Sequence, residues 1–327
     1  MVTEEQKGYY VGIDLGGTNI AAGVTDGSHK VLFEHCVPTD LPRPAHELAQ
    51  AIYDMVKDML ADHKMGFGDI KSVGIGIPGT VNRETGMVEY ANNFGFDHVP
   101  FVTMIKELFP CPVFADNDAK AAAWGEYVAG AGQGSSSMVM MTLGTGVGGG
   151  IILGGRLLAG YNLAAGEFGH MVIKEDGKPC NCGRKGCLEA YASASALVET
   201  AREAAKRQSD SLLNHLCGED LDRINGRMVF QAAEAQDPAA MAVMEEFLTH
   251  LAVGVANVIN MLQPEVLCIG GGLSGAKDKL LEPLRKKVEP MVYSRTSKRN
   301  ARIVAAALGN GAGIIGAAGL WQMGVGL

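Results

Sequence analysis

The sequence predicts an α/β protein with two domains, because a strand–turn–strand pattern occurs twice and each copy opens a region of mixed strands and helices. The first copy is YYVGIDLGGTNIAAGVTD, residues 9–26, and the second is SMVMMTLGTGVGGGIILGG, residues 137–155. Aligning Leu15 with Leu143 places the copies 128 residues apart. We interpret them as a duplicated domain with a site in the cleft between the copies.

The first hairpin contains more polar side chains than a purely structural turn requires. Apolar residues alternate on both sides of Gly16 and Gly17, as expected for half-buried strands. Asp14 and Thr18 add a carboxylate and a hydroxyl beside backbone N–H groups, which suits a phosphate and its metal ion. An ordinary glycine turn explains this stretch equally well when it is taken alone.

The next segment predicts a helix followed by a buried strand. Residues 44–64 place apolar side chains on one helical stripe. The strand SVGIGIPG then matches the GxGxxG spacing at Gly74, Gly76 and Gly79. Its continuation, TVNRETG, is typical of a turn and opens no helix, so we do not expect a dinucleotide site. The second hairpin has the same spacing at Gly144, Gly146 and Gly149, and a strand rather than a helix follows it.

Asp118 stands where a strand is expected to end and a helix to begin. PVFADND predicts the strand, and AKAAAWGEYVAG predicts a helix that starts near Ala119. From the local sequence, Asp118 is either a functional carboxylate or the N-cap of that helix. The two roles are compatible, because a helix N-terminus favours the ionised form of a carboxylate.

The second half of the chain predicts a long buried helix over 237–263, with Asp237 as N-cap and Pro264 as the stop. The strand EVLCIG, a third glycine turn and a charged helix follow. A helix of small residues, GNGAGIIGAAGLWQ, closes the chain and is able to return to the first domain. We predict a small domain of residues 1–119 completed by 311–327, and a large domain of residues 120–310.

Composition excludes several classes of protein. Of the 327 residues, 47% are hydrophobic and 20% charged, which describes a soluble globular chain. A net charge of -8 argues against a nucleic-acid partner. The N-terminus lacks the features of an export signal, and we expect no membrane span. We therefore predict a cytoplasmic protein, in which seven cysteines are not expected to form disulfides.

Four potential metal ligands are clustered in HMVIKEDGKPCNCGRKGCLE. Three thiolates and one imidazole form a closed tetrahedral set that suits a structural Zn²⁺ ion. The alternative is a group of unrelated buried thiols. The predicted ligands are His170, Cys180, Cys182 and Cys187.

The motifs DLGGTN, LGTGVGGG, GEFGHM and CNCGRKGCLE closely resemble the ROK family (repressor, open reading frame, kinase), and within it the bacterial ATP-dependent glucokinases. The resemblance covers nearly the whole chain, and CNCGRKGCLE is its most specific part. It implies a duplicated actin-like ATPase fold, which is ribonuclease H-like, with ATP and a sugar bound in the interdomain cleft.

The resemblance also implies roles for individual residues. Asp118 is the general base that accepts the proton of the sugar hydroxyl as this attacks the γ-phosphate of ATP. His170 uses one ring nitrogen for zinc and the other for a sugar hydroxyl. Ordinary loop polarity is the alternative for the asparagines, and Asn92 and Asn93 are equally plausible by spacing. The implied hexose contacts are Gly79, Asn92, Asn93, Asn117, Asp118, Glu167, His170 and Glu189.

For the nucleotide, the resemblance implies two glycine turns on the phosphates, Mg²⁺ oriented by Asp14 through water, and a third glycine turn under the adenosine. No Walker lysine is required, and no GxxxxGK[ST] motif is present. The implied phosphate contacts are Gly16, Gly17, Thr18, Gly144, Thr145 and Gly146. The implied adenosine contacts are Gly271, Gly272 and Leu273.

The implied function is ATP-dependent phosphorylation of D-glucose to glucose 6-phosphate. Another ROK kinase substrate, such as N-acetylglucosamine, N-acetylmannosamine, fructose or allose, stays open, because the pocket around the sugar's second carbon is not evident from sequence. A sugar-responsive repressor is disfavoured. Repressors of the family carry a helix-turn-helix segment before the sugar-binding fold, whereas strand character begins here by Tyr9. Family members commonly form homodimers or homotetramers.

Overall fold

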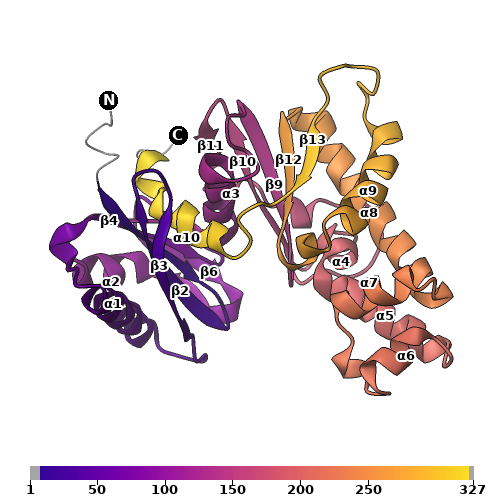
Figure 1. Ribbon diagram of the computed structural model, residues 1–327, viewed down its shortest axis with the longest axis horizontal. Coiled ribbons are helices and arrows are strands. Elements are labelled where there is room, and N and C mark those ends of the chain that lie inside the picture. The colour runs from indigo at the N-terminus through magenta and orange to yellow at the C-terminus, as the bar shows by residue number, and fades with distance from the viewer. Residues whose placement is uncertain (1–7, 324–327) are drawn as a thin grey trace. The chain divides into compact units, whose positions relative to one another are not determined.

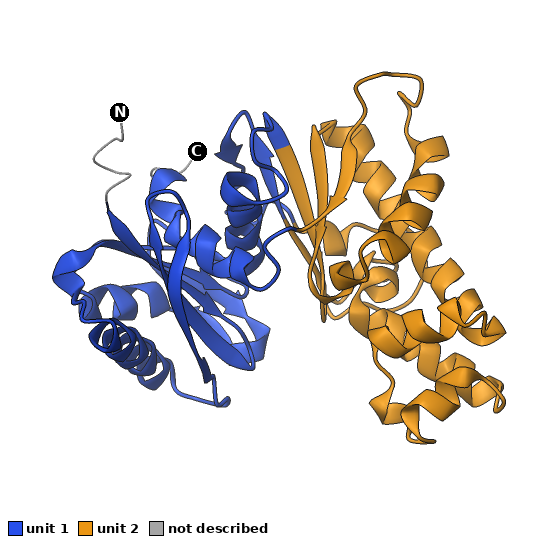
Figure 2. Ribbon diagram, in the orientation of Figure 1, with its two compact units in different colours: residues 1–137, 150–166, 307–327 blue, residues 138–149, 167–306 orange. Residues whose placement is uncertain are grey.

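The computed structural model describes residues 8–323 and divides the chain into two compact units (Figures 1 and 2). Unit 1 comprises residues 1–137, 150–166 and 307–327, and unit 2 comprises residues 138–149 and 167–306. The boundaries of these units differ from those of the predicted domains, since unit 1 extends to residue 137 and also includes residues 150–166. The difference arises because the helix that follows Asp118 makes its packing contacts within unit 1.

The main sheet of unit 1 contains the first predicted hairpin. Its strands have the order β3-β2-β1-β4-β8, with β1 antiparallel to β2 and parallel to β4. The alternating residues Val11, Ile13 and Leu15 are fully buried, as the pattern predicts. The bounds are β1 Tyr9–Leu15, β2 Asn19–Asp26, β3 Val31–Pro38, β4 Ile70–Ile77 and β8 Val113–Asn117.

Helices and a smaller sheet complete unit 1. The predicted helix over 44–64 is confirmed as α1, and its apolar stripe is buried. The helices are α1 Ala45–Asp62, α2 Phe101–Leu108, α3 Asp118–Ala129 and α10 Gly311–Ala318, with short 3₁₀ turns at η2 Phe67–Asp69, η3 Asn92–Phe94 and η8 Leu320–Met323. The small sheet has the order β5-β6-β7, formed by β5 Thr80–Asn82, β6 Met87–Ala91 and β7 Phe96–Val99.

Helix α10, near the C-terminus, packs on β1, β4 and α3 from the N-terminal part of the chain (Figure 1). Small residues allow its backbone to approach very closely. A Cβ atom on Gly12 would lie 1.9 Å from the carbonyl oxygen of Ile314, and one on Gly316 would lie 1.7 Å from that of Ala121. The glycines therefore determine how near α10 lies to these elements.

The second large sheet contains the second hairpin and has the order β11-β10-β9-β12-β13. Strand β12 is parallel to both β9 and β13. The bounds are β9 Ser137–Leu143, β10 Val147–Leu153, β11 Arg156–Leu157, β12 Val266–Gly270 and β13 Arg302–Ala305.

The helices of unit 2 follow η4 in chain order. They are α4 Glu189–Ala192, α5 Ala194–Arg207, α6 Leu212–Cys217, α7 Gly226–Glu234, α8 Pro238–Leu262 and α9 Asp278–Val288. The 3₁₀ turns are η4 Phe168–His170, η5 Leu221–Arg223, η6 Gly272–Ala276 and η7 Glu289–Met291.

Helix α8 confirms the predicted long helix and its N-cap. The Asp237 carboxylate accepts the N–H of Ala240 at 2.9 Å, so Asp237 is the predicted N-cap. By length and composition alone, α8 is the one helix among the described residues that could span a membrane. However, 61% of its most apolar window is buried inside the protein, as expected for a core helix.

Candidate functional site

A backbone hydrogen bond closes the turn between β1 and β2. The N–H of Gly16 donates to the carbonyl of Asn19 at 2.9 Å. Thr39, which is fully buried, braces the turn from outside. Its hydroxyl donates to the carbonyl of Gly16 at 2.7 Å, and its N–H donates to the carbonyl of Thr18 at 2.9 Å. Thr39 was not among the predicted residues, because no local pattern links it to the turn.

Asp14 lies half-buried near the end of β1, directly before this turn. Burial, together with the negative charge of Asp118, raises its pKa to about 6. The N-terminal part of α10 closes over the side chain, because a Cβ atom on Gly313 would lie 2.3 Å from the Asp14 Oδ2. The two carboxylates are therefore electrostatic neighbours, and a cation between or beside them would favour the ionised form of Asp14.

Asp118 is the first residue of α3, at the carboxyl end of β8. The N-cap is Asn117, whose Oδ1 accepts the N–H of Lys120 at 3.1 Å, so the alternative that made Asp118 the N-cap is wrong. The Nδ2 of Asn117 donates to the carbonyl of Gly79 at 3.0 Å. Asp118 itself is half-buried, and its Oδ1 accepts the N–H of Ala119 at 2.8 Å.

Three side chains near Asp118 were missed by the sequence analysis. Asp116 is 2% exposed and forms an ion pair with Arg83 from the β5–β6 loop. Lys120 is also 2% exposed, and its ammonium donates to the carbonyl of Leu163. These contacts fix the end of β8 and the first turn of α3 from two sides. The sequence shows that Asp116 and Lys120 are charged and close to Asp118. It does not show that their partners are Arg83 and Leu163.

The two candidate asparagines, Asn92 and Asn93, lie in the 3₁₀ turn η3 and are exposed. Asn92 accepts a hydrogen bond from the Tyr90 hydroxyl at 3.3 Å. Asn93 lies next to the turn between β1 and β2 instead, since a Cβ atom on Gly17 would be 3.9 Å from its Nδ2. Gly79 has φ of +99°, and a Cβ there would lie 2.0 Å from the carbonyl oxygen of Tyr90, so its position requires glycine.

The second turn, between β9 and β10, is braced by a carboxylate. The N–H of Gly144 donates to the carbonyl of Gly146 at 3.0 Å, and the Glu189 Oε2 accepts the N–H of Val147 at 2.9 Å. A Cβ atom on Gly146 would lie 2.3 Å from this oxygen. A cavity of about 500 Å³ lies beside the turn, lined in part by Thr145, Glu189 and Cys180. Glu189 therefore connects the glycine turn with the segment that carries the cysteines.

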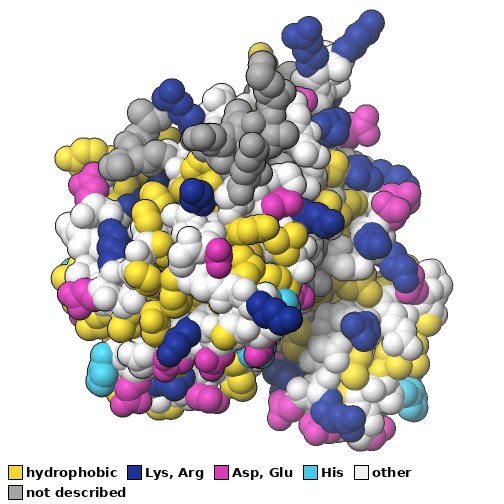
Figure 3. Space-filling view, turned by 60° about the vertical axis from the view of Figure 1, so that its left-hand side comes forward, with side chains coloured by type: hydrophobic (Ala, Val, Ile, Leu, Met, Phe, Trp, Pro, Cys, Tyr) yellow, Lys and Arg dark blue, Asp and Glu magenta, His cyan; other side chains and the backbone are white. Residues whose placement is uncertain are grey.

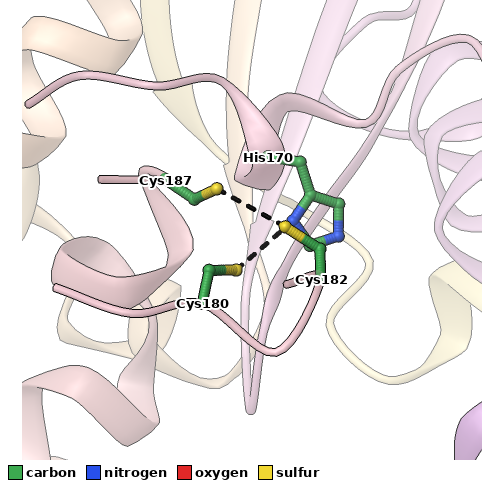
Figure 4. Close-up of side chains that lie close together, drawn as sticks. All are labelled: His170, Cys180, Cys182 and Cys187. Atoms are coloured by element: carbon green, nitrogen blue, oxygen red, sulfur yellow. Dashed lines mark hydrogen bonds between the residues drawn. The ribbon is translucent and has the colours of Figure 1, made fainter. Parts of the chain in front are cut away.

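The predicted metal ligands come together in unit 2 (Figure 4). The ligand atoms of His170, Cys180, Cys182 and Cys187 all lie within 4.8 Å of one another. The sulfur atoms of Cys182 and Cys187 are 3.6 Å apart, and the Cys180 sulfur is 3.7 Å from the His170 Nδ1. Tetrahedral zinc ligands at 2.0 to 2.3 Å from the ion are separated by roughly 3.5 to 3.8 Å, so the geometry fits.

The thiols of the cluster differ in pKa. A hydrogen bond from the N–H of Arg184 lowers the pKa of the Cys182 thiol to about 6, whereas burial raises the pKa of the Cys187 thiol to about 12. Crowded sulfur atoms cannot all carry negative charge unless a cation lies among them. Since Nδ1 of His170 belongs to the cluster, its Nε2 is the nitrogen left for another partner.

Glu167 is exposed and directly precedes η4. Its carbonyl accepts the N–H of His170 at 3.1 Å, which joins the two predicted sugar contacts by one short turn. The guanidinium of Arg184 donates to the carbonyl of His170 from the cysteine loop. The loop that carries Glu167 is therefore fastened to the metal-ligand cluster at His170.

The third glycine turn lies between β12 and η6. Gly271 has φ of +77°, and a Cβ atom there would lie 2.6 Å from the backbone of Leu143, so this turn packs against the end of β9. A pocket of about 310 Å³ opens beside Gly272 and Leu273. Helix α7 and Lys279 supply lining that the sequence analysis missed: Gly226, Arg227, Phe230, Gln231 and Glu234.

With this geometry, comparison with known proteins is informative. A sequence model of the ROK family matches residues 10–323. The chain belongs to the ROK family. Among the relatives of this ROK protein is the glucokinase of Halalkalibacterium halodurans, which is 38% identical over 94% of this chain and 93% of that protein. The glucokinase of Streptomyces coelicolor is 38% identical over 96% of this chain and 97% of that protein.

A solved relative has the same fold over its whole length. The ROK family glucokinase of Streptomyces griseus, in complex with glucose and AMPPNP, is 37% identical to this ROK protein and superposes with a TM-score of 0.84. The match covers 97% of this chain and 100% of that one. The predicted duplicated, two-domain α/β fold of the actin-like ATPase type is therefore confirmed.

Proposed function

We propose that this ROK protein is an ATP-dependent hexokinase that phosphorylates D-glucose to glucose 6-phosphate. The observation that carries the proposal is the half-buried Asp118 next to the half-buried Asp14, in a chain that is 38% identical to bacterial glucokinases over nearly its whole length. ATP as the phosphoryl donor is supported by the AMPPNP complex of the Streptomyces griseus glucokinase. Hexose and ATP are thus its small-molecule partners.

Asp118 acts as the general base. Its carboxylate takes the proton of the sugar's 6-hydroxyl as that oxygen forms a bond to the γ-phosphorus of ATP. The bond from the γ-phosphorus to the bridging oxygen breaks, and ADP leaves with the electron pair. Asn117 caps α3, and the Arg83–Asp116 ion pair anchors β8, so the base is held in place by its neighbours.

Charge neutralisation is assigned to Asp14 and to backbone N–H groups. Bound Mg²⁺ supplies positive charge to the phosphate oxygens, and Asp14 is the residue that would orient it. The first turn offers Gly16, Gly17 and Thr18 to the phosphates. The second turn offers Gly144, Thr145 and Gly146 in the same way.

The hexose contacts are assigned to Asn93, Asp118, Glu167, Glu189 and the Nε2 of His170. Asn92 and Asn117 are secondary candidates, because Asn92 bonds to Tyr90 and both ends of the Asn117 amide bond within unit 1. Adenosine is assigned to Gly271, Gly272 and Leu273, with the adjoining pocket of about 310 Å³ as the space for its base.

Zinc is assigned a structural role. The distances within the His170, Cys180, Cys182 and Cys187 cluster fit a closed tetrahedral site, in which no ligand position is left for substrate. The ion would tie the Glu167 and Glu189 segments together through His170 and Cys187. We further assign the protein to the cytoplasm, as a homodimer or homotetramer.

A coupled assay with ATP and Mg²⁺ tests the substrate. We expect kcat/KM for D-glucose to exceed that for N-acetylglucosamine, N-acetylmannosamine, fructose and allose by at least about tenfold. Preference for an N-acetylated hexose would show that the protein is a kinase for a different sugar. Absence of ATP hydrolysis or transfer with every sugar would remove the kinase assignment altogether.

Replacement of Asp118 tests the mechanism. Asp118→Asn should lower kcat by about a hundredfold or more while glucose binding, measured by calorimetry, changes far less. Asp62→Asn, which alters an exposed carboxylate at the end of α1, is the matched control and should leave kcat unchanged. A variant at position 118 that keeps more than about a tenth of kcat would place the base elsewhere.

A further inference from the structure

Positive charge is concentrated in one segment of an acidic chain. Residues 277–302 contain nine Lys and Arg residues against three Asp and Glu residues, a net charge of +6. The rest of the chain contains 19 against 33, which is -14 and gives the overall -8. Lys and Arg side chains crowd the upper right of the face that the space-filling view presents (Figure 3). The kinase assignment uses only Lys279 of this segment, in the lining of the adenosine pocket.

The segment borders a pocket in unit 2 that is separate from the sites described above. The pocket has a volume of about 530 Å³ and lies between the ends of α8 and α9 and strand β13. Its lining combines apolar side chains from these elements, such as Val288 and Ile303, with a cationic group. The cationic group is Arg285, Lys286, Arg295 and Arg302, and Glu289 is the one carboxylate that lines the pocket among the described residues.

Hydrogen bonds position Arg285 and the loop that carries Arg295. The Nε and Nη2 of Arg285 both donate to the carbonyl of Ile303, at 2.9 and 2.7 Å, which fixes the plane of the guanidinium at the edge of β13. The loop that carries Arg295 is braced by Asn300, whose Oδ1 accepts the Ser294 hydroxyl at 3.2 Å. The same loop is joined to α8, because the Asn260 Oδ1 accepts the N–H of Tyr293 at 2.8 Å.

Little of this positive charge is neutralised by the protein. Within residues 8–323, neither Lys286 nor Arg295 forms an ion pair with a carboxylate. Arg302 approaches Glu265 only to 3.9 Å, and both side chains are about half exposed. A concave site with several cations and an apolar floor suits an anion that has an organic part.

We propose that this pocket binds a small phosphate ester, with the phosphate on Lys286, Arg295 and Arg302 and the organic part on the apolar floor. The volume is that of a small-molecule site, and the surrounding negative charge of the chain disfavours an extended polyanion such as RNA. The pocket shares no lining residue with the adenosine pocket or the cavity beside Thr145. It is therefore a second anion site, independent of the kinase assignment.

Calorimetric titration of the full chain with phenyl phosphate and with inorganic phosphate tests the proposal. The double variant Lys286→Gln/Arg295→Gln should bind phenyl phosphate at least about tenfold more weakly than the native chain. The matched control is Lys298→Gln/Arg299→Gln, which removes the same charge from the same loop outside the pocket lining and should change binding by less than about twofold. Both variants alter exposed side chains, so both should fold normally.

Phenyl phosphate should bind more tightly than inorganic phosphate, because only the ester can cover the apolar floor. Equal loss of binding in the two double variants would show a diffuse charge effect and overturn the proposal, as would failure of the native chain to bind phenyl phosphate. Tighter binding of a single-stranded RNA, lost in the pocket variant alone, would also overturn it by identifying a macromolecular ligand. Any binding of the probes at the adenosine and phosphate turns is common to all three proteins and cancels in the comparison.

Discussion

The two glycine turns occupy equivalent places in a duplicated fold, yet different groups support them. Alignment of the copies places Asp14 opposite Thr142, and Thr18 opposite Gly146. The first turn thus has a half-buried carboxylate before it and is braced by the hydroxyl of Thr39. The second has no carboxylate at the equivalent position and is braced by Glu189 from a distant segment. The two copies thus differ in the carboxylate that accompanies the turn, which is Asp14 on the preceding strand in the first and Glu189 from a distant segment in the second.

Among substitutions that test the difference between the two turns, the largest loss of activity is expected at Asp14. Asp14→Asn should lower kcat by about a hundredfold or more and weaken the dependence of the rate on Mg²⁺, measured in the coupled assay. If Asp14 orients the metal, no other residue of the first turn can replace its carboxylate. Activity and Mg²⁺ dependence close to those of the native enzyme would show that the two copies do not differ in this way.

Asp14 also makes stability depend on pH. Its pKa is raised from 3.8 to about 6, so the folded, ligand-free protein favours the protonated form. The contribution of the protonated Asp14 carboxyl to the free energy of unfolding is complete below about pH 4 and is lost as the pH rises through about 6. Asp14→Asn should therefore raise the free energy of unfolding at pH 8 by about 1 to 3 kcal/mol while leaving it nearly unchanged at pH 4. Denaturant melts at the two pH values measure this, and an equal shift at both would contradict it.

Loss of the metal should disturb the second turn and the loop that carries His170, and leave the first turn unchanged. Cys182→Ser is expected to lose bound zinc, lower Tm by several degrees and raise KM for glucose by about tenfold, because Glu189 and His170 are joined to the cluster. Elemental analysis, thermal melts and kinetics measure the three effects. Cys36→Ser, an exposed cysteine in unit 1, is the control. Unchanged zinc content in the Cys182 variant would mean that the cluster does not hold the ion.

The glycines of the second turn should differ from each other. A Cβ atom on Gly146 would lie 2.3 Å from the Glu189 carboxylate, whereas one on Gly144 meets nothing within 4 Å. Gly146→Ala should raise KM for ATP by about tenfold, and Gly144→Ala by no more than about threefold. Similar values for the two variants would indicate that the hydrogen bond from Val147 to Glu189 does not support the turn.

The smallest effect is expected at Thr39. Thr39→Val removes the hydroxyl that donates to Gly16 but keeps the shape of the side chain, so the free energy of unfolding should fall by about 1 to 2 kcal/mol. KM for ATP should rise modestly with it. Thr249→Val is the control, because it removes a half-buried hydroxyl that donates to the carbonyl of Glu245 within α8 and should leave KM for ATP unchanged. An unchanged KM would show that the bend of the first turn is maintained without this brace.

The sequence predicted what depends on neighbouring residues. Both hairpins, the N-cap of α8 and the clustering of His170 with three cysteines are specified by alternation, by one capping side chain and by close spacing, all of which are local. It did not predict Thr39 under Gly16, or Glu189 on Val147. These contacts join residues far apart in the chain, and tertiary packing that selects such partners leaves no periodic signal.

The error at Asp118 has the same cause. Asn117 and Asp118 are both good capping residues, and only the path of β8 into α3 determines which of them precedes the first helical turn. The partners of Asp116 and Lys120 could not be predicted from the sequence either, since Arg83 and Leu163 lie in other parts of the chain. The sequence shows that Asp116 and Lys120 are charged, but not that they are buried or which residues they contact.

The close packing of α10 on β1 and α3 has a consequence for how the protein is made. Unit 2 has all its residues once the ribosome has added residue 306, but unit 1 lacks the element that covers Gly12 and Ala121 until residue 318 has been translated. Segments far apart in the sequence thus complete the same unit. A chain that lacked residues 311–318 would leave β1 and α3 without the helix that packs on them.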